Sequence, residues 1–275
     1  MATAASWCVR GFSGDPPRQA WLWAAVLRAG PAAVLSHQTA AELHGLTTEP
    51  APAIHVLVPS GSQIAPITGV ALHYSRRVSE TRHPVLLPPR TRVEEAVLDL
   101  ATAASSLDLA LGWIFRACGS RRTTPGKLSA AMLVRPRMRW RGELSEALSL
   151  AASGVHSLLE FRYVDRVERP HGLPPGKRQH AVCRGGRRQY QDVDYGCYGV
   201  VVELDGQAAH PAGLRWGDIR RDNANAAEGQ VTLRYGWPDV TERPCRVAAE
   251  IGATLGRRGW DGTLRRCGRS CALSG

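Results

Sequence analysis

The stretch YQDVDYGCYGVVVELDG, residues 190–206, predicts two strands of a sheet and the tight turn between them. The GCYG at residues 196–199 predicts the turn. The three valines at 200–202 are typical of a strand in the middle of a sheet. Because side chains alternate along a strand, Glu203 and Asp205 share one face and lie about 7 Å apart. The apolar strand therefore ends in two carboxylates.

Two further acids are expected near this strand end. An antiparallel turn brings Asp194 roughly opposite Glu203 or the valine before it, and Glu160 lies in a predicted helix upstream. Converging carboxylates repel one another and lose hydration, which a divalent cation relieves. Oxygen ligands suit Mg²⁺, and a bound cation can hold a phosphodiester and activate water. The alternative is a plain Asp-Gly turn with Asp205 in solvent, but it does not explain Glu203 after the valines.

The surrounding sequence predicts an α/β (α+β) domain over residues 153–256, with a mixed sheet flanked by helices. Hydrophobic periodicity and the positions of glycine and proline define its elements. The expected elements are a helix at 156–174, a three-strand meander at 177–206, a helix at 212–229, a strand at 230–237 and a helix at 238–255.

Three other regions are expected along the chain. Residues 1–90 read as a small α/β region, residues 91–152 as a helical connector and residues 257–275 as a basic, flexible tail. The histidines of the first region match no metal-binding spacing, so we expect packed or surface side chains. Those considered are His37, His44 and His55.

The 275-residue chain carries a net charge of +11 and has a pI near 9.9. This balance favours a polyanionic partner such as nucleic acid, although an arginine-rich proteome would have the same effect. No apolar run approaches the roughly 18 residues needed to span a membrane, and no signal peptide is recognised. We therefore expect a cytoplasmic protein without a membrane partner.

Seven scattered cysteines without a CxxC pair argue against a disulfide framework. Cys245, Cys267 and Cys271 could hold a metal ion, but no fourth ligand is evident from the sequence. Free thiols are the favoured interpretation.

A run of positive charge falls on the hairpin beside the acids, with no acidic residue from 177 to 188. Cations on flanking phosphates and carboxylates on a metal are the arrangement that DNA cleavage requires. The alternative is a solvated hairpin in an arginine-rich protein. The predicted DNA-binding residues of the hairpin are Lys177, Arg178, Arg184, Arg187 and Arg188.

The C-terminal half resembles the PD-(D/E)XK nuclease superfamily. The closest branch comprises uncharacterised actinobacterial proteins related to very-short-patch-repair mismatch endonucleases. The resemblance covers roughly residues 154–256 and implies a restriction-endonuclease-like sheet. It rests on Glu160, QDVDY at 191–195, VVELDGQAAH at 201–210, GDIRRDN at 217–223 and VTLRYGW at 231–237.

The resemblance also implies roles for single residues. Asp194 and Glu203 would bind the metal, Glu160 would be the helix carboxylate and His210 a catalytic histidine. Asp205 stands where the superfamily has a lysine that positions the attacking water. The short-patch-repair enzymes also lack this lysine and use histidine chemistry. The expected catalytic set is Glu160, Asp194, Glu203, Asp205 and His210. Polar residues that recur around the site correspond to Asp218, Arg221 and Arg234, and the two arginines are predicted to contact DNA.

The stretch WLWAAVLRAGPAAVLSHQTAAELHGL, residues 21–46, resembles AbiEi-type antitoxins of type IV toxin–antitoxin systems. Those relatives usually begin with a winged helix, which is absent here. Two main functions follow as hypotheses. The first is a Mg²⁺-dependent DNA endonuclease. The alternative is a non-catalytic DNA-binding transcriptional regulator or antitoxin with a toxin-system partner. A fragment without activity is a third.

Overall fold

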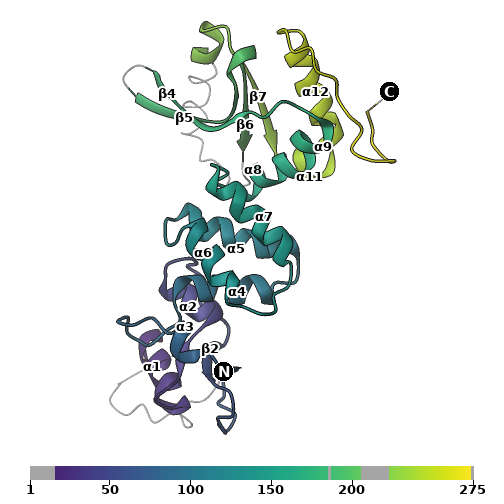
Figure 1. Ribbon diagram of the computed structural model, residues 1–275. Helices are drawn as coiled ribbons and strands as arrows, with labels where there is room; N and C mark the ends of the chain where they lie inside the picture. Colours follow the sequence, from purple (N-terminus) through teal and green to yellow (C-terminus); the bar gives the residue numbers. More distant parts are fainter. Residues whose placement is uncertain (1–15, 185–186, 206–222, 274–275) are drawn as a thin grey trace. The chain divides into compact units, whose positions relative to one another are not determined.

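The computed structural model describes residues 16–184, 187–205 and 223–273 (Figure 1). The chain divides into two compact units, residues 1–149 and 150–275. Each unit contains a sheet with both parallel and antiparallel strand pairs, together with helices. The predicted α/β class is confirmed.

Unit 1 (residues 1–149) contains a three-stranded sheet in the order β1-β2-β3. Its strands are β1 (Val34–Leu35), β2 (Ile54–Pro59) and β3 (Val70–Ser75). Strand β2 pairs antiparallel with β1 and parallel with β3. Leu22 and Val26 of helix α1 (Arg18–Ala29) share a buried cluster with Val56 and Val58 of β2. The apolar stripe of α1 is therefore covered by the sheet.

Further helices lie between β1 and β2 and after β3, and the last of them runs to residue 152, past the end of unit 1 at residue 149. They are α2 (His37–Leu43), α3 (Val78–Thr81), α4 (Val93–Ala103), α5 (Leu107–Gly119), α6 (Pro125–Leu133) and α7 (Arg141–Ala152). Helix α2 packs against α4, and Leu35 makes backbone hydrogen bonds with Pro89 and Thr91. Unit 1 therefore contains residues 1–90 together with most of the helical region at 91–152. We expected these as separate regions.

Unit 2 (residues 150–275) contains a four-stranded sheet in the order β4-β5-β6-β7. Its strands are β4 (Lys177–Arg184), β5 (Arg187–Tyr195), β6 (Val200–Asp205) and β7 (Val231–Gly236). The first three are antiparallel neighbours, as the predicted meander requires, and β7 joins β6 in parallel.

The predicted helix at 156–174 is present in three parts. Helix α8 (Leu158–Tyr163) continues through a π-helical turn (Val164–Glu168) into α9 (Arg169–His171). The Ser157 hydroxyl caps its start by accepting the Glu160 N–H. Gly172 ends it at φ 69°, a left-handed conformation that glycine adopts without strain.

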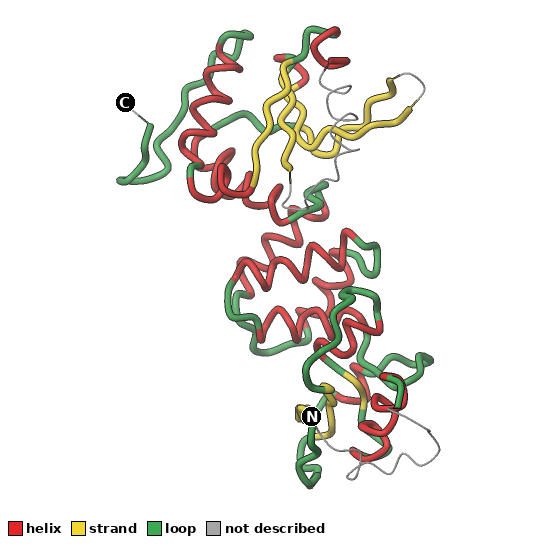
Figure 2. The backbone as a smooth tube through the Cα atoms, turned by 180° about the vertical axis from the view of Figure 1, so that it is seen from behind, coloured by secondary structure: helices red, strands yellow, loops and turns green. Residues whose placement is uncertain are grey.

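Two further helices in the described part of unit 2 are α11 (Trp237–Glu242) and α12 (Pro244–Gly256). Residues 223–227 are also helical, at the end of the helix predicted at 212–229. Figure 2 shows α12 running alongside the strands.

The hydrophobic core of unit 2 lies between one face of the sheet and the helices. Because side chains alternate along a strand, β5 and β6 each present every second residue to this core. The core side chains include Tyr163, Val193, Tyr195, Val200, Val202, Leu204, Val247, Ile251 and Leu255. The other face of β5 and β6 is left for the acids.

The C-terminal segment after α12 is held against unit 2. Trp260 and Leu264 pack on the core, and the Arg265 N–H donates to the His171 carbonyl at 2.8 Å. Cys271 is buried. In the described residues 257–273, a few apolar side chains among the arginines therefore contact unit 2, and the flexible tail that we expected stays a prediction.

None of the helices in the described parts of the chain is both long and apolar enough to cross a membrane.

Candidate functional site

Four acids lie on the face of the unit 2 sheet that is turned away from the helical core. The core-facing residues of β5 have odd numbers and those of β6 have even numbers. Alternation therefore places Asp192 and Asp194 of β5 with Glu203 and Asp205 of β6 on the opposite face. The alternation of side chains along β5 and β6 thus supports the expected convergence of acids on one face of the sheet.

The register differs from the one that we expected. Asp194 is the Cα partner of Val201, so the prediction that it lies opposite Glu203 or the valine before it is wrong. The turn uses only residues 196–199, because Gly199 adopts a left-handed conformation with φ 60°, and pairing resumes with Tyr195 opposite Val200. Continued by one residue, the register places Asp192 opposite Glu203.

Asp192 reaches across to the neighbouring strand. Its Oδ2 accepts the Leu204 N–H at 2.8 Å, and its Oδ1 accepts a hydrogen bond from Gln179 Nε2 at 3.0 Å. The Leu204 amide lies between Glu203 and Asp205, so Asp192 is the β5 acid that contacts the end of β6. Neither Asp192 nor Gln179 was predicted as a site residue.

Asp194 lies nearer the turn. It is buried, and its Oδ2 is 2.6 Å from His180 Nδ1. This contact is close without the alignment of a hydrogen bond, and Asp194 Oδ1 and His180 Nδ1 are buried without hydrogen-bond partners. Because Asp194 is opposite Val201, it is diagonal to Glu203 across the strand pair. Diagonal neighbours have Cα atoms about 7–8 Å apart.

Glu160 is a buried carboxylate in the first turn of α8. Its oxygens accept hydrogen bonds from the Ser157 hydroxyl and the His156 N–H, both at 3.0 Å. Burial raises the pKa of Glu160 above its ordinary value, and the charge of Asp192 adds to this rise. Gln179 hydrogen-bonds both Glu160 and Asp192. The structure therefore brings the predicted helix carboxylate together with Asp192 rather than with Asp194.

Arg234 places a cation beside the two acids of β6. It is the Cα partner of Glu203 in the parallel pair, and its Nη1 lies 3.3 Å from Asp205 Oδ2. The Asp205 side chain is 43% exposed, so its attraction to Arg234 is screened by solvent. Asp205 is therefore half-exposed to solvent, which agrees with the alternative of a plain turn. It is also paired with Arg234.

Several predicted residues lie outside the described parts of the chain. Residues 206–222 include the expected catalytic histidine and one of the expected DNA-binding arginines, so neither is placed. These residues are His210, Asp218 and Arg221.

The basic hairpin has an exposed and a buried part. Lys177 and Arg188 are exposed, and the Arg188 guanidinium lies 5.3 Å from the ring centre of Tyr190, which is 49% exposed. Arg184 and Arg187 are Cα partners at the end of the hairpin. An exposed cation beside an exposed aromatic ring suits a nucleic-acid chain.

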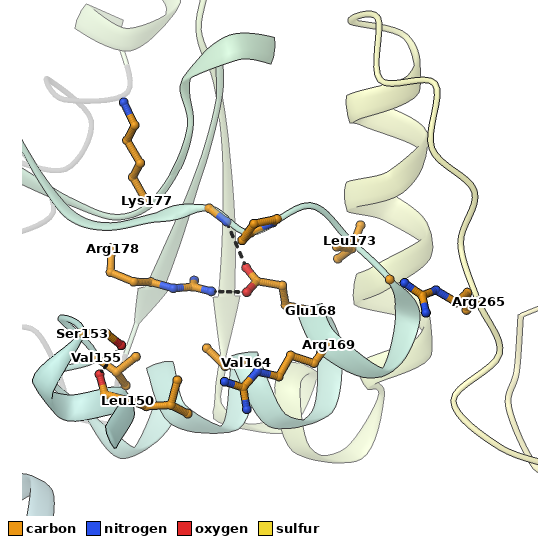
Figure 3. A pocket seen from close by; sticks show the side chains of 13 residues that line it. Leu150, Ser153, Val155, Val164, Glu168, Arg169, Leu173, Lys177, Arg178 and Arg265 are labelled. Atoms are coloured by element: carbon orange, nitrogen blue, oxygen red, sulfur yellow. Dashed lines mark hydrogen bonds and ion pairs between the residues drawn. The ribbon is translucent and has the colours of Figure 1, made fainter. Parts of the chain in front are cut away.

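Arg178 points into unit 2 instead of toward a DNA backbone. Its side chain is 9% exposed, and its Nη2 lies 2.5 Å from Glu168 Oε1 (Figure 3). Glu168 Oε2 also accepts hydrogen bonds from the Tyr195 hydroxyl and the Gly176 N–H. Alternation turns Arg178 to the core side of β4, and its pair with Glu168 argues against the predicted contact with DNA, which stays a prediction.

Clusters of potential metal ligands occur away from the sheet acids. Within the described residues, groups of three or more ligand atoms lying within 4.8 Å of one another comprise His37 with His55 and His73, and His171 with Cys245, Cys267 and Cys271. The acids of the sheet face do not form such a group.

The histidines of unit 1 form a stack. The His37 and His73 ring centres are 3.8 Å apart with planes 17° apart, and His55 Nδ1 lies 2.9 Å from His73 Nε2. Because His55 and His73 each use a ring nitrogen in this hydrogen bond, we interpret the cluster as a packed stack and not as a metal site. His44 lies apart and contacts the Thr91 carbonyl at 2.8 Å. The expectation of packed histidines agrees with this arrangement, but His73 was missed.

The His37 stack predicts that acid destabilises unit 1. Burial, followed by the charges of His73 and His55, lowers the pKa of His37 to about 3. Below pH 6.5 the unfolded chain therefore binds a proton that the folded chain does not, and stability falls by up to about 1.4 kcal/mol per pH unit. Asp99 has the opposite effect between pH 6 and 4. Burial raises its pKa to about 6, so in this range the folded chain binds a proton that the unfolded chain does not, and acid stabilises the fold. We expect His37→Gln to flatten the decline of the urea midpoint between pH 6.5 and 4. Equal slopes in the two proteins would count against this assignment.

Comparison with models of known protein families finds no match, and no curated protein matches the chain in sequence. The resemblances seen in the sequence therefore stay predictions.

Proposed function

We propose that unit 2 is a metal-dependent DNA endonuclease whose site lies on the acidic face of β5 and β6. The observation that carries this proposal is the hydrogen bond from the Leu204 N–H to Asp192 Oδ2. It brings an acid of β5 to the β6 backbone between Glu203 and Asp205. Glu160 joins them through Gln179. Carboxylates from β5, β6 and α8 thus lie near the same edge of the sheet.

Carboxylate oxygens are the ligands that a hard cation such as Mg²⁺ prefers, so the chemistry of these donors supports Mg²⁺, although within the described residues they do not form a close group of ligand atoms. Asp192 and Glu203 would hold the ion, with Asp194 as the alternative β5 ligand. When bound, the ion would supply polarisation of the phosphodiester and a lower pKa for the attacking water. Gln179 holds the Asp192 carboxylate in position by donating a hydrogen bond to it, and Gln179 in turn contacts Glu160. Their role is orientation of the ligand, as hydrogen-bond partners of metal-binding groups usually provide.

Arg234 supports the proposal because it supplies a positive charge that Asp205 cannot. In the resembled superfamily a lysine occupies the position of Asp205. Here the guanidinium of Arg234 reaches that position from the adjacent strand, 3.3 Å from Asp205 Oδ2. A planar guanidinium offers several donors to a phosphate group. Arg234 would offset the charge that develops on the phosphate.

The test is cleavage of supercoiled plasmid by the purified protein. We expect conversion to the nicked form when Mg²⁺ is added and none when Mg²⁺ is left out. Intact plasmid in the presence of Mg²⁺ would contradict the endonuclease proposal.

A second candidate function is DNA binding without cleavage, as expected of a regulator or antitoxin. The exposed Arg188, Tyr190 and Lys177 of the hairpin favour it, because they could bind DNA whether or not the acids hold a metal ion.

Alanine at Lys177 and Arg188 is expected to weaken DNA binding without Mg²⁺. Each lost phosphate contact should lower the slope of log Kobs against log salt by about 1. Arg246→Ala on α12 is the matched control, because Arg246 is 70% exposed and pairs only locally with Glu250. Gel-shift titrations at several salt concentrations measure the effect. An unchanged salt slope in the double variant would show that DNA does not contact the hairpin.

A further inference from the structure

Three cysteines and one histidine from distant parts of the sequence meet in unit 2. His171 is the last residue of α9, Cys245 lies in the first turn of α12, and Cys267 and Cys271 lie in the C-terminal segment. Their ligand atoms all lie within 4.8 Å of one another. This cluster is separate from the acids of the sheet face.

The sulfur separations fit a tetrahedral metal site. Cys245 Sγ lies 3.7 Å from both Cys267 Sγ and Cys271 Sγ. With Zn–S bonds of about 2.3 Å, two sulfurs of a tetrahedral site are about 3.8 Å apart. A disulfide would need about 2.05 Å, so the three sulfurs are placed for a common ligand and not for a bond to one another.

His171 gives an independent indication of a ligand. Its ring is fully buried, and Nδ1 lies 2.9 Å from the Val167 carbonyl, so Nδ1 carries the proton. Nε2 then presents a lone pair, and it is buried without a hydrogen-bond partner. A buried polar atom without a partner is costly. A histidine that donates Nδ1–H to a backbone carbonyl and presents Nε2 is the usual arrangement of a metal ligand.

We propose that His171 Nε2 and the three sulfurs of Cys245, Cys267 and Cys271 bind one Zn²⁺ ion in a closed, structural site. Thiolate and imidazole donors in a tetrahedron select zinc over the oxygen-preferring Mg²⁺. All four positions are filled by protein, which leaves none for water or substrate. The three thiols lose their protons to solvent on binding, and the imidazole binds as the neutral ring.

The ion would fasten the C-terminal segment to the helical side of unit 2. The segment already packs Leu264 against α12, where an added Cβ on Gly252 would lie 2.8 Å from the leucine. The Arg265 N–H donates to the carbonyl of His171 itself. The metal would therefore connect three segments of the chain, which are α9, the first turn of α12 and the C-terminal segment. Zinc binding would contribute to the stability of the folded unit.

The test measures metal content and ligand type in the full-length, reduced protein. We expect about one zinc per chain by elemental analysis, and Co²⁺ in its place should give the charge-transfer absorption of thiolate ligands with the d–d bands of a tetrahedral ion. Cys267→Ser should weaken zinc binding at least about 100-fold in competition with a chelating dye, because loss of an outer-shell partner alone costs 10–100-fold. Cys267 is exposed, so this change leaves the core intact.

Cys183→Ser is the matched control, since Cys183 is exposed and lies outside the cluster. It should keep one zinc per chain with unchanged affinity. Folded wild-type protein that binds neither Zn²⁺ nor Co²⁺ would overturn the proposal. Full zinc content in the Cys267→Ser/Cys271→Ser double variant would overturn it as well. The Co²⁺ spectrum of the wild type decides the question even if a variant fails to fold.

Discussion

Asp192→Asn is expected to reduce Mg²⁺-dependent nicking of DNA at least about 100-fold, the effect of losing a charged group that stabilises the transition state. Asparagine keeps the size of the side chain, and its oxygen can still accept the Leu204 N–H that Asp192 Oδ2 accepts. The variant loses the negative charge that a cation requires. Glu203→Gln should reduce nicking to a similar extent, because Glu203 lies opposite Asp192 in the extended register.

Asp194→Asn is the matched comparison. Asp194 pairs with Val201 and contacts His180, so its loss should lower nicking less than tenfold. If Asp194→Asn abolishes nicking and Asp192→Asn does not, the metal ligand is Asp194 and our assignment of Asp192 is wrong. Mg²⁺ should be omitted rather than chelated, because a chelator would also remove the proposed zinc. The urea midpoints of both variants distinguish lost chemistry from lost folding.

The element pattern of unit 2 could be predicted because local signals agree with one another. Ser157 and Gly172 mark the ends of the helical segment, and three valines mark the buried strand. The register could not be predicted, because it depends on how many residues the GCYG turn uses. Side chains have a period of two, so a shift of two residues keeps the acids on the same face but changes which of them meet. The expected register brought Asp194 to the end of β6, whereas the observed register brings Asp192 there.

The proposed zinc ligands could not be predicted as a set from the sequence for a different reason. His171 lies 74 residues before Cys245, and only the packing of the C-terminal segment brings them together. The arginines of that segment suggested a solvated tail, whereas Trp260 and Leu264 decide its position. For Arg178 a usable signal did exist. Lys177 and Arg178 are neighbours on a strand, so only one of them can face solvent.

Arg178→Met is expected to destabilise unit 2 by roughly 3–5 kcal/mol, the cost of leaving one charge of a buried pair uncompensated. The charge left behind would be Glu168, which is 5% exposed. Glu168 also accepts the Tyr195 hydroxyl at 3.1 Å, and Tyr195 contacts the Tyr163 hydroxyl at 2.7 Å. Burial raises the pKa of Tyr195 well above its ordinary value, so this tyrosine stays neutral, and its hydroxyl can only donate a hydrogen bond to the unpaired Glu168 carboxylate. The measurement is the urea unfolding transition of unit 2.

Lys177→Met is the matched control on the adjacent, exposed position, and its effect should stay within about 0.5 kcal/mol. A double variant with Arg178→Met and Glu168→Gln removes both charges and should recover part of the loss, because methionine and glutamine keep most of the volume without an unpaired ion. If Arg178→Met unfolds at the wild-type urea concentration and yet weakens DNA binding, Arg178 faces DNA after all. In that case the buried pair with Glu168 does not describe the protein in solution. Recovery in the double variant, with DNA affinity retained in folded protein, would assign Arg178 to the core of unit 2 and leave Lys177 and Arg188 as the DNA-facing cations of the hairpin.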